Sequence, residues 1–412
     1  MRQSKLFTKT LKEAPKDEIS LNSVLLIRAG LVDKLTAGVY TFLPLGLLVL
    51  NKIKNIIREE MNAIGAQEIF MPALQPKEPW AKTGRWTDPG PEVMFQFKGR
   101  SEKEYGLGWT HEEIITTLAK KFVSSYKDLP FGAYQIQDKF RNEPRAKSGL
   151  LRGIEFSMKD LYSFHADEKD LQAYYEMVMG AYAKIFERCG LQALVTEASG
   201  GSFSKFSHEY QVLAEAGEDT IYYCEKCRYA RNKEIYEFKP GDKCPKCSGV
   251  IIEGKAIEVG NIFPLKDKYS KPLELFFADE KGERKPVMMG CYGLGPSRVM
   301  GTIVEVYHDQ KGIIWPEALA PLKVHLLALG KDGKIYIKAK SLYEKLLKEK
   351  IEVLYDDRQE ISAGQKFAES DLLGLPYRLV VSEKAGDKIE IKKRNSDSSE
   401  LIDEKKLLKL LS

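Results

Sequence analysis

The segment from Phe140 to Asp160, FRNEPRAKSGLLRGIEFSMKD, constrains the fold of this 412-residue chain more than any other segment. A polar, glycine-containing turn separates two stretches that we expect to be strands. The first stretch ends in Arg141 and Glu143. The return stretch carries Arg152 and Phe156. The segment therefore predicts two strands that run in opposite directions and present these side chains on one face of a sheet.

The chemistry of these four side chains fits a nucleoside triphosphate. Guanidinium groups bind phosphate oxygens in a forked geometry, so Arg141 and Arg152 are candidate phosphate ligands. An adenine ring needs a flat partner and an acceptor for its amino protons, and Phe156 and Glu143 supply these. Taken alone, the pattern also fits a basic hairpin that packs against solvent.

A second segment, GCYGLGPSRVMGTIVEVYHD, contains Gly293, Gly295 and Arg298 in the pattern G-x-G-x-x-R. Glycines at such a turn let the backbone approach a ligand closely, and an arginine in the first helical turn adds its charge to the free amide donors. A glycine-rich turn is by itself often only a tight strand-to-helix connection. Together with the first segment, it indicates an ATP site.

Composition sets broad limits on the class of protein. With 43% apolar and 30% charged residues, a chain of this length is sufficient for two or three domains with sizeable cores. The net charge of +5 permits a polyanionic partner but is far below the strongly basic balance of an obligate nucleic-acid binder. Any RNA contact must therefore come from local patches.

Nothing in the sequence predicts export or membrane insertion. The first residues, MRQSKLF, lack an apolar signal-peptide core. The longest uncharged run, residues 35–50, is interrupted by Gly38, Pro44 and Gly46 and is too short to span a bilayer. We expect a cytoplasmic protein without membrane contact.

Four of the six cysteines form the pattern C-x2-C-x16-C-x2-C. The pattern consists of Cys224, Cys227, Cys244 and Cys247. This spacing is typical of a zinc ribbon, in which four thiolates surround a structural Zn²⁺, and it indicates a reducing compartment. The alternative is a degenerate ribbon whose thiols stay reduced and bind no metal.

Apolar periodicity predicts the main elements. Helices are expected over residues 45–64 and 171–189, with a short strand over 67–74 between them. After Pro321 the pattern alternates between strands and helices, which predicts a small α/β domain with a mixed sheet. In that domain we expect strands over 322–329, 351–355, 377–381 and 388–392, and helices over 334–350, 362–373 and 399–411.

The two glycine and arginine segments resemble motifs 2 and 3 of the class II aminoacyl-tRNA synthetases, and further stretches resemble bacterial-type prolyl-tRNA synthetases. These stretches are RAGLVDKLTAGVYTFLPLGL, GWTHEE, MKDLYSFH, EVGNIFPLKDKYS, CYGLGPSR and DDRQEISAGQKFAESDLLGLPYRLVV. The resemblance implies an α+β fold. An antiparallel-sheet catalytic domain over residues 1–318 would contain a zinc-ribbon insertion at 221–250, and a mixed-sheet anticodon-binding domain would occupy 321–412.

The resemblance also implies the reaction and its residues. The family joins L-proline to tRNA(Pro) at the expense of ATP, through a prolyl-adenylate. It would assign the α-phosphate and the substrate carboxylate to Arg141, the outer phosphates to Arg152 and Arg298, adenine to Glu143 and Phe156, and Mg²⁺ to Glu258. The proline pocket would consist of Thr110, Glu112, Phe164, His165, Cys291 and Gly293. Without the family, Cys291 is a buried structural thiol and His165 a hydrogen-bonded core residue.

Further expectations concern partners. The family implies a homodimer, built on the helix and strand of residues 45–74, which otherwise form an ordinary surface helix docked on a sheet. Because only 16 residues separate the two cysteine pairs, no editing domain fits there, and we expect a separate trans-acting deacylase. Candidate RNA contacts, each of which is otherwise a solvated surface charge, are Lys366, Arg378, Lys392, Lys393 and Arg394.

The chain departs from the family pattern at Trp109, Ile154 and Asn261, where proline, arginine and histidine are usual. These departures affect the expected adenine and Mg²⁺ contacts. Two other readings remain. One is a class II relative with threonyl, histidyl or glycyl specificity, and the other is a synthetase-like protein without enzymatic activity. The second conflicts with the presence of Arg141, Arg152 and Arg298.

Overall fold

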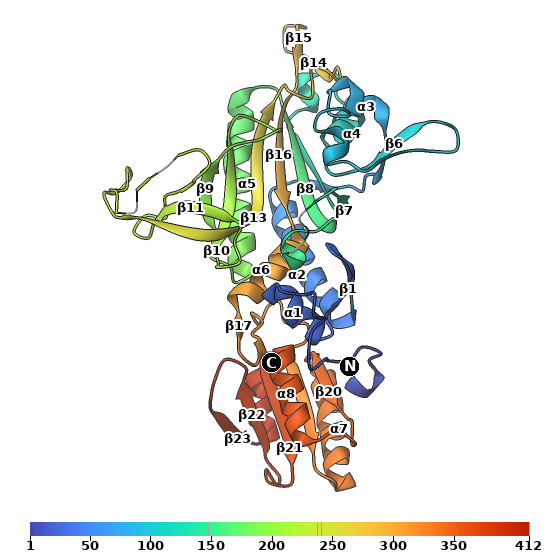
Figure 1. Ribbon diagram of the computed structural model, residues 1–412, viewed down its shortest axis with the longest axis vertical. Helices are drawn as coiled ribbons and strands as arrows, with labels where there is room; N and C mark the ends of the chain where they lie inside the picture. Colours follow the sequence, from blue (N-terminus) through green and yellow to red (C-terminus); the bar gives the residue numbers. More distant parts are fainter. Residues whose placement is uncertain (145, 147, 237, 240, 412) are drawn as a thin grey trace. The chain divides into compact units, whose positions relative to one another are not determined.

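The computed structural model describes residues 1–144, 146, 148–236, 238–239 and 241–411 (Figure 1). The chain divides into two compact units. The large unit comprises residues 36–39 and 53–302, and the small unit comprises residues 1–35, 40–52 and 303–412. No helix within the described residues is long and apolar enough to cross a membrane.

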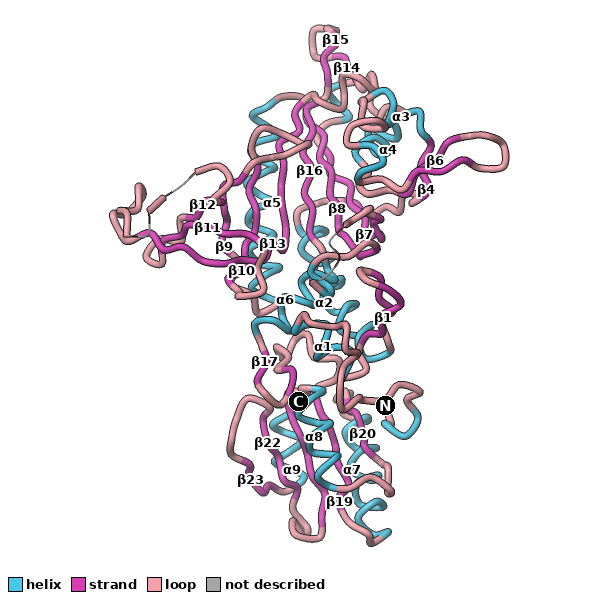
Figure 2. The backbone as a smooth tube through the Cα atoms, in the orientation of Figure 1, coloured by secondary structure: helices cyan, strands magenta, loops and turns pink. Residues whose placement is uncertain are grey.

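The large unit is built on a nine-stranded sheet with strand order β10-β9-β12-β11-β13-β16-β8-β7-β3. Its central strands are antiparallel, whereas β9 with β12 and β3 with β7 pair in parallel. The strands are β3 (Gln67–Glu68), β7 (Phe131–Phe140), β8 (Glu155–His165), β9 (Leu194–Ala198), β10 (Ser207–Leu213), β11 (Asp219–Cys224), β12 (Ala230–Asn232), β13 (Ile251–Lys266) and β16 (Met288–Leu294). Figure 2 shows the long central strands side by side.

The predicted antiparallel pair is present, but Arg141, Glu143 and Arg152 lie in the connection between its two strands and not in the strands themselves. β7 pairs with β8 from Phe131 opposite Phe164 to Phe140 opposite Glu155. On one face the sheet is covered by α5 (Glu168–Arg188), whose Tyr174 and Tyr175 rings pack against Tyr292 of β16. Because side chains alternate along a strand, the residues that point away from α5 lie on the opposite face. That face carries the site.

Smaller elements surround this sheet. A three-stranded sheet, β4-β6-β5, consists of β4 (Leu74–Pro76), β5 (Gln96–Lys98) and β6 (Glu104–Leu107). The large unit also contains α3 (Lys77–Lys82), α4 (Glu112–Ala119) and the hairpin of β14 (Phe276–Ala278) and β15 (Arg284–Pro286). Two helices cross the boundary between the units in sequence, α2 (Pro44–Ala63) and α6 (Pro296–Val306).

The small unit contains a five-stranded mixed sheet with order β20-β19-β21-β22-β23. The first three strands in this order are parallel and the last two are antiparallel additions. Its strands are β19 (Val324–Leu329), β20 (Val353–Asp356), β21 (Tyr377–Ser382), β22 (Ile389–Lys393) and β23 (Ser399–Ile402), and its helices are α1 (Leu21–Arg28), α7 (Gly333–Lys348), α8 (Ala363–Leu373) and α9 (Glu404–Leu411). Short pairs occur in β1 (Val32–Thr36) with β2 (Val39–Phe42), and in β17 (His308–Asp309) with β18 (Gly312–Ile313).

Two element predictions are wrong in part. Residues 399–411 do not form one helix, because β23 first pairs with β22 and Asp403 then begins α9 by accepting a hydrogen bond from the Lys406 amide at 2.8 Å. The strand expected over residues 67–74 is only Gln67–Glu68, with β4 starting at Leu74. Pro72 lies between them and has no amide hydrogen to donate to a ladder.

Three of the candidate RNA-contacting cations are not solvated charges. The Lys366 ammonium is buried and donates to the Ala328 carbonyl at 2.9 Å. Arg378 pairs with Asp371 at 2.8 Å, and Arg394 pairs with Asp309 at 2.7 Å. These contacts fix the fold of the small unit.

Candidate active site

Arg141 lies immediately after β7, at the base of the hairpin. Its amide donates to the Ile154 carbonyl at 2.8 Å, and the Ile154 amide donates in turn to the Gly38 carbonyl at 2.8 Å. Gly38 has a φ of +74°, and a Cβ there would lie 2.8 Å from the Ile154 nitrogen, so the turn requires glycine. This backbone network fixes where the Arg141 side chain begins.

The Arg141 side chain is half-buried, with a buried Nε, and its guanidinium carbon lies 5.1 Å from the centre of the Phe156 ring. Burial, followed by the positive charge of Arg298, lowers its pKa to about 10, so it stays charged at neutral pH. Its Nε has no hydrogen-bond acceptor and it forms no ion pair with any described residue. A partly buried cation that lines two cavities and has no counter-ion among the described residues can bind an anion there.

Arg298, in the first turn of α6, is held by the backbone and by one carboxylate. Its Nε donates to the Leu151 carbonyl at 2.9 Å, and its Nη1 donates to the Glu258 carbonyl at 2.8 Å and to Glu258 Oε2 at 3.1 Å. These bonds connect the second glycine and arginine segment to β13 and to the turn of the first segment. The two sequence segments therefore meet in space.

Arg152 occupies the more exposed edge of the same region. Its Nε pairs with Glu143 Oε2 at 2.9 Å, and its Nη1 contacts the Glu218 carboxylate. Glu143 therefore orients an arginine in this structure.

Two adjoining cavities of about 290 Å³ each open on this face of the sheet. The first is lined by all six residues that the sequence suggested for ATP, which are Arg141, Glu143, Arg152, Phe156, Glu258 and Arg298. Arg141, Phe156, Glu258 and Arg298 also line the second cavity. The two cavities thus share a wall of three charged side chains and an aromatic ring.

The second cavity contains Thr110, Glu112, Cys291 and Gly293. Glu112 opens α4 and is fully buried, and its Oε2 accepts from Thr110 Oγ1 at 2.6 Å. Its Oε1 accepts from Cys291 Sγ at 3.1 Å. Burial and then the Glu112 charge raise the pKa of Cys291 well above its usual value, so this thiol is a neutral donor.

Two residues expected in this pocket lie elsewhere. Phe164 is fully buried, stacks on Phe131 at 4.6 Å between ring centres, and belongs to an apolar cluster that also contains Cys291. His165 is one position further along β8, so its side chain points to the opposite face and its Nδ1 lies 2.7 Å from Asp170 of α5. The alternative reading of His165 as a hydrogen-bonded core residue describes its position.

Sequence reasoning missed several residues that line the second cavity. Met158 and Asp160 lie on β8 at alternate positions after Phe156, and strict strand alternation would have found them. Asp160 pairs with the buried Lys139 at 2.8 Å, and Lys139 Nζ lies 2.9 Å from His111 Nδ1. Glu209 of β10 also lines this cavity, and no local pattern points to it.

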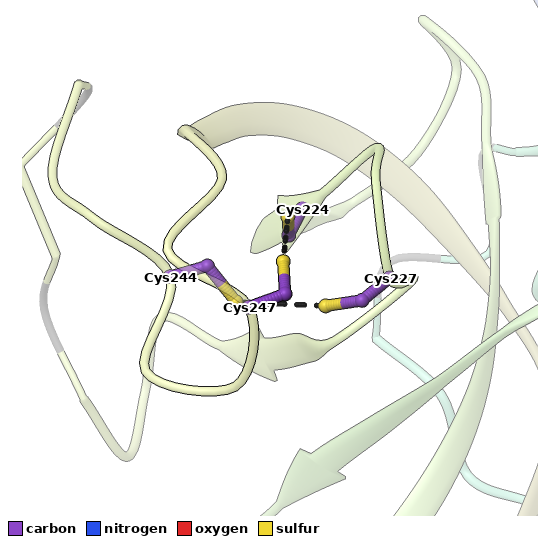
Figure 3. Close-up of side chains that lie close together, drawn as sticks. All are labelled: Cys224, Cys227, Cys244 and Cys247. Atoms are coloured by element: carbon purple, nitrogen blue, oxygen red, sulfur yellow. Dashed lines mark hydrogen bonds between the residues drawn. The ribbon is translucent and has the colours of Figure 1, made fainter.

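The four clustered cysteines converge at the end of β11, in the turn after it and in the segment between β12 and β13 (Figure 3). Their sulfur atoms lie within 4.8 Å of one another, with 3.6 Å between Cys224 and Cys247 and 3.5 Å between Cys227 and Cys244. Tetrahedral Zn²⁺ with Zn–S bonds of 2.3 Å requires sulfur separations of about 3.8 Å. The residues present therefore fit a zinc ion, and all six cysteines of the chain are free thiols.

Comparisons with known proteins agree with this geometry. A family model described as "tRNA synthetase class II core domain (G, H, P, S and T)" matches residues 95–307, and one described as "Anticodon binding domain" matches residues 323–412. The fold and the site thus define a class II aminoacyl-tRNA synthetase.

Individual relatives narrow the class. A proline–tRNA ligase of Wolbachia sp. subsp. Drosophila simulans is 42% identical over 408 residues, which cover 96% of this chain and 95% of the relative. One from Sulfurihydrogenibium sp. is 36% identical over 560 residues, which cover 100% of this chain and 99% of the relative. The chain belongs to the proline–tRNA ligase family. Its fold is similar to the solved prolyl-tRNA synthetase of Giardia lamblia in complex with prolyl-adenylate, with a TM-score of 0.77, 20% identity and coverage of 93% of this chain and 74% of that chain.

Proposed function

We propose that this chain joins L-proline to tRNA(Pro) in two steps, through a prolyl-adenylate, with release of pyrophosphate and then AMP. The observation that carries the proposal is the shared wall of the two cavities. ATP in the first cavity and proline in the second would meet at Arg141.

In the proline half, Glu112 supplies the charge that holds the secondary ammonium and Thr110 supplies the second acceptor. Cys291 and Gly293 form the wall against the ring. Gly293 suits this role because a Cβ there would have no contact closer than 3.8 Å, which leaves space above the sheet. Phe164 packs in the apolar cluster that contains Cys291, and we assign His165 no role at the substrate.

In the ATP half, Arg141 binds the α-phosphate and the substrate carboxylate, while Arg152 and Arg298 bind the outer phosphates. Phe156 stacks on adenine, and the Glu143 carboxylate accepts its amino protons. Glu258 would hold Mg²⁺, which supplies positive charge to the phosphates when bound. Its carboxylate lines both cavities, as that role requires.

The first step needs alignment and positive charge. The proline carboxylate is already ionised at neutral pH, so no residue has to remove a proton from it. Arg141 holds that carboxylate against the α-phosphorus and stabilises the charge that develops there, as expected for an in-line phosphoryl transfer. Its burial makes this interaction stronger than it would be in water.

We divide the chain into a catalytic domain, residues 1–318, which includes a structural zinc ribbon at 221–250, and a domain that binds the tRNA anticodon, residues 321–412. The family matches at 95–307 and 323–412 support this division. Of the five candidate cations, Lys392 and Lys393 of β22 are the ones we retain for RNA contact, since Lys366, Arg378 and Arg394 have internal partners.

We infer a short, bacterial-type form without editing in cis. The alignment to the Sulfurihydrogenibium relative extends over 560 positions, although this chain has 412, whereas the Wolbachia alignment extends over 408. The longer relative therefore carries residues with no counterpart here. We further propose a cytoplasmic homodimer that relies on a separate trans-acting deacylase.

Proline-dependent exchange of pyrophosphate into ATP, with alanine, cysteine and threonine as competitors, tests the proposal. We expect exchange to be fastest with proline. Exchange that depends on threonine, or no exchange with any amino acid, would refute it and would favour another class II specificity or a non-catalytic protein.

A further inference from the structure

Arg85 lies in the turn that follows α3 and is not among the residues that line the two cavities. Its side chain is 6% exposed. Four aromatic rings surround the guanidinium carbon, at 4.4 Å for Trp109, 5.1 Å for Phe203, 5.2 Å for Trp80 and 5.3 Å for Tyr269. Ring faces attract a cation, so this cage holds a planar charged group in one orientation.

Arg85 contacts two buried carboxylates through a single nitrogen. Its Nη1 donates to Glu112 Oε2 at 3.2 Å, and to Glu113 at 3.0 Å and 3.1 Å. Thr83 Oγ1 donates to Glu113 at 2.9 Å. Glu112 Oε2 therefore accepts hydrogen bonds both from Arg85, which lies outside the cavity, and from Thr110, which lines the cavity.

The charged groups in direct contact with Arg85 do not balance its charge. One guanidinium faces two carboxylates, both with 0% exposure of their side chains. Burial raises the pKa of Glu113 to about 7, although the Arg85 charge opposes this rise. A second cation beside Glu112 would balance the group, and in the proposed function the ammonium of proline is that cation.

We propose that Arg85 is a positioning residue for the proline site. Held by its four aromatic rings, Arg85 fixes the Glu112 carboxylate. Because it neutralises only one of the two carboxylates, Glu112 and Glu113 together need one further cation. The proposal rests on the proposed function and adds the residue that controls substrate affinity and its pH dependence. Proline would bind most tightly when Glu113 is ionised, because two cations then meet two anions.

Other charged or titratable groups also face this pair. They are Lys268 and Tyr269 beside β13, Cys291 of β16, Tyr162 and Asp160 of β8, His111 before α4, Lys139 of β7 and Arg141. Burial lowers the pKa of His111 to about 4, and burial raises the pKa of Tyr269 and Tyr162. Between pH 6 and pH 8 these three groups keep one charge state, whereas the pKa of Glu113, about 7, lies within this range.

The test compares Arg85→Gln with Arg85→Lys by proline-dependent exchange between pH 6 and pH 8. In the wild type we expect KM for proline to rise about tenfold as pH falls one unit below the pKa of Glu113. At pH 8, R85Q should raise KM for proline by about 10- to 100-fold, the usual effect of losing a hydrogen bond to a charged group. KM for ATP should change less than about twofold, because that site does not contact Arg85.

The pH profile separates positioning from general damage. In R85Q, protonated Glu113 and ionised Glu112 already balance the charge of proline, so KM for proline should no longer vary between pH 6 and pH 8. R85K keeps the charge and should keep the pH dependence, with a smaller rise in KM. A pH-dependent KM in R85Q, or an equal rise in KM for proline and ATP, overturns the proposal.

Thr83→Val provides a second measurement if R85Q does not fold. It removes one hydrogen bond that lowers the pKa of Glu113 and leaves Arg85 in place. The rise in KM for proline should then begin at a higher pH than in the wild type, and an unmoved profile contradicts the proposal. Absence of proline-dependent exchange in the wild type would instead refute the proposed function.

Discussion

At the scale of single residues, Arg141 is the group on which the proposed chemistry depends most. We predict that Arg141→Ala lowers proline-dependent exchange by at least about 10²- to 10³-fold, the range for losing one preorganised charge-stabilising donor. Pyrophosphate exchange measures this directly. The matched control is Arg100→Ala, which removes an exposed arginine of the same unit and should leave exchange unchanged. Near-normal exchange in Arg141→Ala would contradict the assignment.

Lys159 lies one position before Asp160 on β8 and points to the face covered by α5, where it contacts Tyr182 Oη at 2.5 Å. Burial lowers its pKa to about 7 in the folded protein, whereas the unfolded chain keeps a value near 10.5. Between pH 7 and pH 10 the unfolded chain therefore binds an extra proton, and folding becomes more favourable as pH rises.

We predict that wild type gains stability relative to Lys159→Met by up to about 1.4 kcal/mol per pH unit across this window. Chemical denaturation of both proteins at pH 7, 8.5 and 10 gives the difference in free energy of unfolding. All other titrating groups are common to the two proteins. A difference that does not change with pH would contradict burial of this lysine.

The sequence predicted residues whose chemistry is visible in a short motif. Short sequence motifs identify the charged residues Arg141, Arg298 and Glu112. The structure brings all three to the two adjoining cavities. Arg85 was not predictable in this way, because its partners lie 27 and 28 positions away and its cage comes from four separate segments. His165 was expected in the proline pocket, but its side chain lies on the face that α5 covers, because neighbouring residues of a strand point to opposite faces.

At the scale of elements, periodicity predicted the long helix after Pro44, the long helix α5 and the alternating order of the small unit. Periodicity did not separate β23 from α9. Both elements are short, and the few apolar residues between 399 and 411 do not distinguish a strand from a helix. Pairing with β22, a contact that a local pattern does not contain, selected the strand.

The predicted zinc site at the cysteine cluster can be tested by a direct measurement of metal content. We predict one zinc per chain by elemental analysis, and loss of that zinc in Cys244→Ser together with faster proteolysis near residues 221–250. Cys189→Ser is the matched control, since Cys189 is a buried cysteine outside the cluster and its variant should retain zinc. Full zinc content in Cys244→Ser would contradict the four-thiolate site.

At the scale of the whole molecule, the short chain has a consequence for accuracy. A pocket that accepts proline cannot exclude alanine by size, and small apolar differences discriminate by only about 10- to 200-fold. We therefore predict that the purified protein forms alanyl-tRNA(Pro) and does not hydrolyse it. Measuring deacylation of preformed alanyl-tRNA(Pro) tests this, and rapid clearance by the purified chain alone would contradict the inferred lack of editing in cis.

The central claim is that one continuous site holds ATP and proline on the open face of the large sheet. A crystal structure of the protein with a non-hydrolysable prolyl-adenylate analogue tests it most directly. The account predicts adenine on Phe156, the phosphate mimic within hydrogen-bond distance of Arg141, and the ring ammonium on Glu112. An analogue bound outside the two cavities, or bound without contact to Arg141, would contradict it.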